Sequence, residues 1–283
     1  MKRAVVIFLL FALAQIIGSA VALLFGNVGS IGQGRPLAEL PVSPEACGVA
    51  LFVVEFLLTL GLLWFYGWAD RSLPRPSLPP LGAARKWLAL GGMMALSVGL
   101  SLLLDPLQLD DGGAQLLFEG MKHNGLCVLL LCLVGPACEE LVFRRGVLQG
   151  MIQAGCSPLW SVVLSSVAFA LVHGNLMQMV PAFVSGIALG FCFLRTGNLR
   201  LCLPLHVANN VLAVLLMYFP QVEQGITACG TFCCIALGLI LLLLSVAALR
   251  RALAAPAASG GAKPAAPISS SISNDNNRTD SCR

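Results

Sequence analysis

The chain has 283 residues, of which 58% are hydrophobic and only 11% are charged. A soluble globular domain carries about 25% charged residues, so this chain has too few to cover a water-soluble particle. Its eleven cysteines form no CxxC pair, and most lie inside apolar runs, which excludes a secreted disulfide scaffold. The net charge of +4 carries no nucleic-acid signature when charges are so scarce, and no nucleic-acid partner is expected. The composition predicts a membrane protein.

Apolar segments long enough to cross a bilayer recur along the chain. A spanning helix needs about 20 apolar residues, and such helices are predicted near 4–25, 48–68, 87–104, 125–147, 158–174, 176–194, 201–219 and 231–249. The predicted fold class is all-α, a polytopic bundle of about eight transmembrane helices. The first segment could instead be a signal peptide cleaved near Ala20-Val21-Ala22, although its apolar run exceeds the usual core of about 7 to 15 residues.

The distribution of basic residues orients these helices. Lys and Arg are retained on the cytoplasmic side of a membrane. With the N-terminus inside, fifteen of the seventeen basic residues fall in inner segments, and only Arg35 and Lys122 lie outside. We therefore expect a multi-pass protein of the cell inner (plasma) membrane with both termini in the cytoplasm.

Two stretches are not expected to span. The proline-rich segment 73–80 is typical of a stiff linker, and the tail from 254 to 283 has the composition of a disordered segment. The predicted organisation is a single membrane domain. Its parts are three N-terminal transmembrane helices with their loops in 1–124, a core in 125–219, a last helix in 220–253 and the tail in 254–283.

Ionisable side chains occur within the predicted spans, where each costs about 2.5–3.5 kcal/mol unless it is paired or used. Glu140 and Arg144 are four residues apart, which predicts an ion pair on one helix face. Glu139 is turned by about 100° and has no such partner, so the two carboxylates can divide acid and base roles. A purely structural ion pair is the alternative interpretation.

Two further pairs share helical faces in the following spans. Phe169 and His173 are four residues apart, and so are His206 and Asn210. The second pair offers donors and acceptors suited either to a metal ligand set or to an oxyanion clamp. Hydrogen bonds between helices are the structural alternative for each residue taken alone. A turn at 155–157 would place Glu139 and His173 at equal depth on antiparallel helices.

These residues, in this order, resemble the CPBP family: the type II CAAX prenyl endopeptidases and bacterial relatives linked to bacteriocin processing and self-immunity. The family's E-E-x-x-x-R motif matches Glu139, Glu140 and Arg144. Its F-x-x-x-H motif matches Phe169 and His173, and the H-x-x-x-N motif begins at His206. The resemblance covers roughly residues 125–219. It implies an intramembrane endopeptidase whose helices enclose a polar cavity and whose substrate is a membrane-tethered peptide or protein, CAAX-type or bacteriocin-like.

The resemblance also implies a role for each matching residue. Glu139 would activate the attacking water as general base, with His173 positioning that water or sharing its proton. His206 and Asn210 would stabilise the oxyanion, while Glu140 would be held by Arg144 as scaffold or would help to polarise the catalytic site. Phe169 supports the site.

Several alternatives remain open at this point. The family is commonly labelled a metalloprotease, which would make Glu139, His173 and His206 zinc ligands; we favour a metal-free mechanism because the His206 pairing is more typical of a clamp. A noncatalytic transporter, immunity or scaffold protein would use the same cavity for binding. Arg144 and Arg145 are expected to form a basic, cytoplasmic rim where substrate enters. Glu55, also at membrane depth, belongs to none of the motifs.

Overall fold

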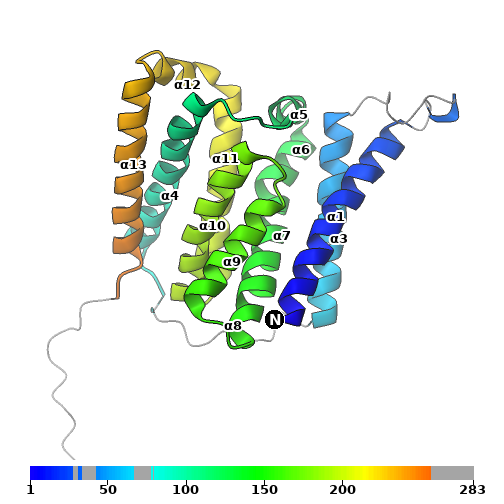
Figure 1. Ribbon diagram of the computed structural model, residues 1–283, viewed down its shortest axis with the longest axis horizontal. Helices are drawn as coiled ribbons and strands as arrows, with labels where there is room; N and C mark the ends of the chain where they lie inside the picture. Colours follow the sequence, from blue (N-terminus) through cyan, green and yellow to red (C-terminus); the bar gives the residue numbers. More distant parts are fainter. Residues whose placement is uncertain (28–30, 34–42, 67–77, 79, 256–283) are drawn as a thin grey trace, which may run out of the picture.

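The computed structural model describes residues 1–27, 31–33, 43–66, 78 and 80–255. The predicted linker at 73–80 and the tail therefore lie almost wholly outside the described residues. Every regular element in the described part is helical (Figure 1). The longer helices are α1 (Lys2–Gly26), α3 (Pro44–Tyr66), α4 (Ala83–Leu104), α9 (Pro158–Leu171), α10 (Leu176–Thr196), α11 (Leu199–Tyr218) and α13 (Thr231–Ala252).

Short helical segments complete the bundle. At one end lie η3 (Asp105–Leu107), α5 (Ala114–Met121) and α12 (Pro220–Thr227). A continuous rod crosses the middle as α6 (Gly125–Leu129), η4 (Leu130–Val134), α7 (Gly135–Glu140), η5 (Leu141–Leu148) and α8 (Gln149–Gln153). The segments η4 and η5 are π-helical.

Seven helices in the described residues are long and apolar enough to span a membrane, rather than the predicted eight. The difference is α9, which covers 14 residues and ends at Leu171. At about 1.5 Å per residue it is roughly 21 Å long, short of the ~30 Å hydrocarbon core. The chain still reverses direction after α9, at Gly174 with φ +76°, so α9 occupies the place of the missing span. The polytopic all-α bundle is confirmed.

Polar residues at the helix ends explain where these helices begin. Asn124, Ser157, Asn175 and Asn198 each precede a helix and accept hydrogen bonds from its first free backbone N–H groups, as N-caps do. The caps at Ser157 and Asn198 follow tight reversals, and the reversal before Ser157 confirms the predicted turn near 155–157.

The helices pack in antiparallel neighbours, with α1 against α3, α4 against α13 and α9 against α10. The contact between α9 and α10 is close because α10 carries Gly190, where an added Cβ would lie 2.9 Å from Val162 Cγ1. Dispersion and close approach of small residues are the main sources of helix association in a bilayer.

One end of the bundle gathers the helix termini that carry basic residues. The start of α1, the start of α4 and the end of α13 all lie there in Figure 1, opposite α5 and α12. Arg85 donates from Nε to the Ala252 carbonyl at 2.7 Å, and Arg195 Nη2 donates to the Leu253 carbonyl at 3.0 Å. These arginines satisfy the last carbonyls of α13, where a cation is favoured. We call this the basic end.

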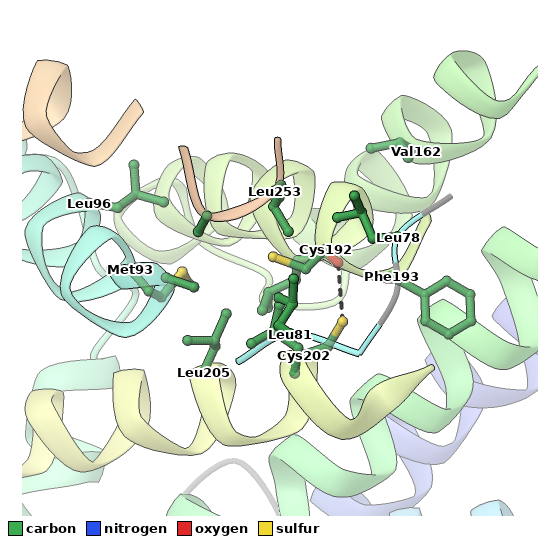
Figure 2. Close-up of a cluster of buried hydrophobic side chains, with 14 of the residues drawn as sticks. Leu78, Leu81, Met93, Leu96, Val162, Cys192, Phe193, Cys202, Leu205 and Leu253 are labelled. Atoms are coloured by element: carbon green, nitrogen blue, oxygen red, sulfur yellow. Dashed lines mark hydrogen bonds between the residues drawn. The ribbon is translucent and has the colours of Figure 1, made fainter. Parts of the chain in front are cut away.

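A large apolar cluster fills the bundle at the basic end. Figure 2 shows Leu78, Leu81 and Leu253 packed among side chains of α4, α10 and α11, including Cys192 and Leu205. The buried Cys202 thiol donates to the Leu189 carbonyl at 3.4 Å. The cluster closes this end, so the polar part of the interior lies on the other side of it.

Candidate active site

A cavity of about 1190 Å³ lies within the bundle and extends to the α5 end. Five of the predicted site residues line it: Glu139, Phe169, His173, His206 and Asn210. Arg144 and Arg145 do not line it, and the Arg144 side chain is fully buried. The prediction that these arginines form the rim of the cavity is therefore wrong, because the cavity extends away from the basic end.

The segment that carries the two glutamates is not a regular α-helix. The N–H of Gly135 bonds to the carbonyl of Leu130, five residues back, which is a π-helical turn. The next residue is Pro136, which has no N–H to donate. As a result the carbonyl of Leu131 has no partner inside its own helix. Wide turns of this kind are frequent at functional sites.

Asn210 of α11 bonds to that free carbonyl. Its Nδ2 donates to the Leu131 oxygen at 3.0 Å, which fixes the orientation of the amide and leaves its second N–H available. Nothing in the motif predicted this contact; Pro136, five residues after Leu131, was the only sequence signal for it. A buried carbonyl without a partner would cost about 1–3 kcal/mol, so the contact also ties α11 to the rod.

The predicted ion pair between Glu140 and Arg144 is present and wholly buried. Arg144 Nε lies 3.1 Å from Glu140 Oε2, with 0% and 1% of the two side chains exposed. The guanidinium also lies over the ring of Phe169, with Cζ 5.3 Å from the ring centre. Its two terminal nitrogens have no hydrogen-bond partner among the described residues. The ion pair keeps Glu140 ionised, and because the Arg144 side chain is fully buried it cannot reach a substrate in the cavity.

His206 lies between the two carboxylates. Its Nδ1 is 3.0 Å from Glu140 Oε1, and its Nε2 is 3.4 Å from Glu139 Oε2. Since Glu140 is a carboxylate paired with Arg144, it can only accept a hydrogen bond, so Nδ1 of His206 carries a proton. Nε2 is then the nitrogen that faces Glu139 and the cavity.

His173 follows the end of α9 and lines the same cavity. Its Nδ1 bonds to the carbonyl of Phe169 at 2.8 Å, which leaves Nε2 for the cavity. The Phe169 ring packs edge-on against His173 and His206, with ring centres 4.9 Å and 5.7 Å apart. The predicted face shared by Phe169 and His173 is confirmed, and Phe169 connects the two histidines.

The ligand set predicted for zinc is not assembled in this arrangement. Nδ1 of His206 is taken up by its hydrogen bond to Glu140, so Nε2, 3.4 Å from Glu139 Oε2, is its one nitrogen that could bind a metal. Among the residues the structure describes, no three His, Cys, Asp or Glu side chains converge as metal ligands. As placed, Glu139, His173 and His206 do not fit a zinc ion.

Glu55, which the motifs did not explain, also lines the cavity. It is 1% exposed and accepts a hydrogen bond from Gln15 of α1. The sequence marked Glu55 as out of place, but the contact with Gln15 depends on the pairing of α1 with α3 and had no local signal.

The region that holds these residues matches a known family. Residues 122–212 match the model described as "Type II CAAX prenyl endopeptidase Rce1-like", a range that includes all three motifs. The chain is also 22% identical, over 211 residues, to the Bacillus subtilis (strain 168) protein named "Putative membrane peptidase YdiL", covering 71% of this chain and 83% of that protein.

A shorter similarity, 29% over 97 residues, links the chain to an uncharacterized protein of Mycoplasma capricolum and covers 32% of this chain and 27% of the relative. No solved structure matches. The matched range includes the helices that carry the two adjacent glutamates and the two histidines. With its three motifs on the helices that carry these residues, the chain is similar over residues 122–212 to the type II CAAX prenyl endopeptidases, and over 71% of its length to a protein named as a putative membrane peptidase.

Proposed function

We propose that the chain is an intramembrane endopeptidase that hydrolyses a peptide bond of a membrane-tethered substrate. The observation that carries the proposal is the linked series Arg144, Glu140, His206 and Glu139. The first carboxylate is neutralised and positions the imidazole, and the second faces the cavity. A carboxylate that orients a histidine from behind is a recurring way to fix its tautomer for catalysis.

In this proposal Glu139 is the general base. It takes a proton from a water molecule, the water oxygen attacks the scissile carbonyl carbon, and the carbonyl oxygen becomes an oxyanion. The protonated Glu139 then delivers that proton to the leaving amine nitrogen as the C–N bond breaks. His173, through its cavity-facing Nε2, positions the water.

The oxyanion is stabilised from the α11 side. A protonated Nε2 of His206 and the remaining N–H of Asn210 supply two donors on one helix face. Both are held in place before substrate arrives, His206 by Glu140 and Asn210 by the Leu131 carbonyl. Fixed donors of this kind are worth about 100- to 1000-fold in rate each.

The proposal is tested by cleavage of a membrane-tethered fluorogenic peptide by protein purified in detergent. Glu139→Gln should lower the rate by about 100- to 10,000-fold, and His206→Ala by about 100-fold or more. Glu45→Gln and His123→Ala are matched controls: both residues are exposed and lie outside the cavity lining. They should cleave at the wild-type rate.

Two outcomes would contradict the proposal. If Glu139→Gln and His206→Ala fold and cleave like wild type, the assigned machinery is wrong. If the folded wild-type protein cleaves no peptide but binds one, the cavity serves the noncatalytic role. The metal question is settled by measuring bound zinc and assaying after chelation; activity that chelation removes and zinc restores would refute the metal-free mechanism proposed here.

A further inference from the structure

The lining of the cavity is one-sided in charge. Among the described residues that line it, five are acidic and none is Lys or Arg. A concave, low-dielectric surface with charges of one sign concentrates counter-ions of the other sign. The five acidic residues are Glu55, Asp105, Asp111, Glu119 and Glu139.

Three of these carboxylates already have partners. Asp111 accepts backbone hydrogen bonds at the start of α5. Glu119 pairs with Lys122, which lies outside the lining, and Glu139 faces His206. Their charges contribute to the field of the cavity, but their contacts are explained within the chain.

Glu55 is different because half of its carboxyl group is unsatisfied. Oε1 accepts a hydrogen bond from Gln15, whereas Oε2 is buried and has no partner among the described residues. Leaving a buried acceptor unpaired is costly, and a carboxylate at membrane depth is rare unless it is paired or used. Glu55 thus places in the cavity wall a buried hydrogen-bond acceptor, Oε2, to which no group in the described chain donates.

Packing of α3 on the rod places Glu55 beside the catalytic carboxylate. Phe52, one turn before Glu55, presses on Gly135, where an added Cβ would lie 2.6 Å from the Phe52 ring. Gly135 is one turn before Glu139, and the two carboxylates interact electrostatically. A positive group bound at Glu55 would relieve the repulsion between them.

The α3 wall that leads to Glu55 is apolar. The residues of α3 that line the cavity before it are Pro44, Cys47, Gly48, Leu51 and Phe52, a single stripe along the helix. A chain that follows this stripe needs an apolar stem and a charged tip. Lysine has that form, with a four-carbon stem and a compact ammonium group.

We propose that Glu55 is a specificity residue that binds a lysine side chain of the substrate close to the scissile bond, so that the enzyme selects cationic peptides. This inference rests on the proposed peptidase function, which supplies the peptide substrate. The acidic residues at the α5 end of the cavity attract such peptides, and Glu55 forms an ion pair with the lysine ammonium group inside the cavity.

The test uses synthetic membrane-anchored peptides that are identical except at one position, which holds lysine, methionine or glutamate and is moved along the peptide. Binding is measured first, on the Glu139→Gln protein, so that the result does not depend on cleavage. At one position the lysine peptide should bind about tenfold tighter than the methionine peptide, and tighter still than the glutamate peptide. In the Glu55→Gln/Glu139→Gln protein the ratio of lysine to methionine affinities should fall to about one.

Cleavage provides the second readout. Wild type should show the same preference in kcat/KM, Glu55→Asp should retain it, and Glu45→Gln, which changes an exposed carboxylate on the same helix, should leave it unchanged. The preference should persist at high salt, which screens the exposed carboxylates more than the buried one.

The inference is overturned if no position favours lysine in binding, or if the preference survives Glu55→Gln. Should Glu55→Gln not fold, the wild-type preference and its retention in Glu55→Asp decide the matter alone. A protein that cleaves without discriminating refutes this inference and leaves the proposed function intact. A protein that discriminates through Glu55 but cleaves nothing refutes the proposed function instead.

Discussion

Replacing Arg144 with methionine isolates the energetic role of the buried ion pair. Methionine fills much of the same volume but removes the charge, so Glu140 would be left ionised in a site where 1% of it is exposed. Breaking a buried pair by removing one partner costs about 3–5 kcal/mol. Because His206 still donates to Glu140, we expect the lower end of that range, about 3 kcal/mol.

For a chain of this size, about 3 kcal/mol corresponds to a fall in Tm of roughly 6–12 °C. Thermal unfolding in detergent, followed by circular dichroism at 222 nm, measures it. The double variant Arg144→Met/Glu140→Gln removes both charges and should recover about 2 kcal/mol of the loss. Arg145→Met is the matched control. Because Arg145 is only partly buried, this variant should lose less stability than Arg144→Met.

Two results would refute this reasoning. If Arg144→Met unfolds at the wild-type temperature, the pair contributes nothing that methionine packing does not replace. If the double variant is no more stable than Arg144→Met alone, the loss comes from packing around the guanidinium and not from an uncompensated carboxylate.

Three further expectations follow from contacts described above. Phe169→Leu should lower cleavage by about tenfold, because it removes the edge-on contacts with His173 and His206, each worth about 0.5–1.5 kcal/mol. Tm should fall as well, since the contact with Phe143 is also lost; a cleavage rate equal to that of wild type would contradict this. Gly190→Leu should lower Tm by several degrees through overpacking against Val162, and Val162→Ala should partly restore the Tm. Backbone hydrogen bonds at the start of α5 hold the pKa of the Asp111 carboxyl below its ordinary value of 3.8. The stabilisation of α5 by Asp111 should therefore be present above that value and be lost as pH falls through the lower folded-state pKa. Amide-exchange protection of α5 measures this loss, and Asp111→Asn should abolish its pH dependence.

The local part of the site could be predicted from the sequence, because it depends on spacing within one helix. The contacts of Glu140 with Arg144 and of Phe169 with His173 each join residues four apart, and both are present. The position of His206 could not be predicted in the same way, since it depends on how α11 packs against residues 66 positions earlier. Its spacing from Asn210 was consistent with either a metal ligand or an oxyanion-binding residue.

The extent of the helices was predicted less well than their existence. Residues 158–174 are apolar enough for a full span, but Ser157 and Gly174 limit α9 to a shorter helix. The π-helical turns around Glu139 also escaped prediction, because a period of 3.6 residues was assumed throughout. Their position alters which carbonyls are free, and that is information a hydropathy pattern does not contain.

The proline in the rod links two distant positions. Any other residue at 136 would bring a backbone N–H that competes with Asn210 for the carbonyls of η4. The orientation of the Asn210 side chain on α11 therefore depends on the absence of a backbone N–H at Pro136 in the neighbouring rod. A replacement at 136 would strengthen the rod and release the amide of Asn210 together, so a more regular helix at this position is expected to weaken the proposed activity.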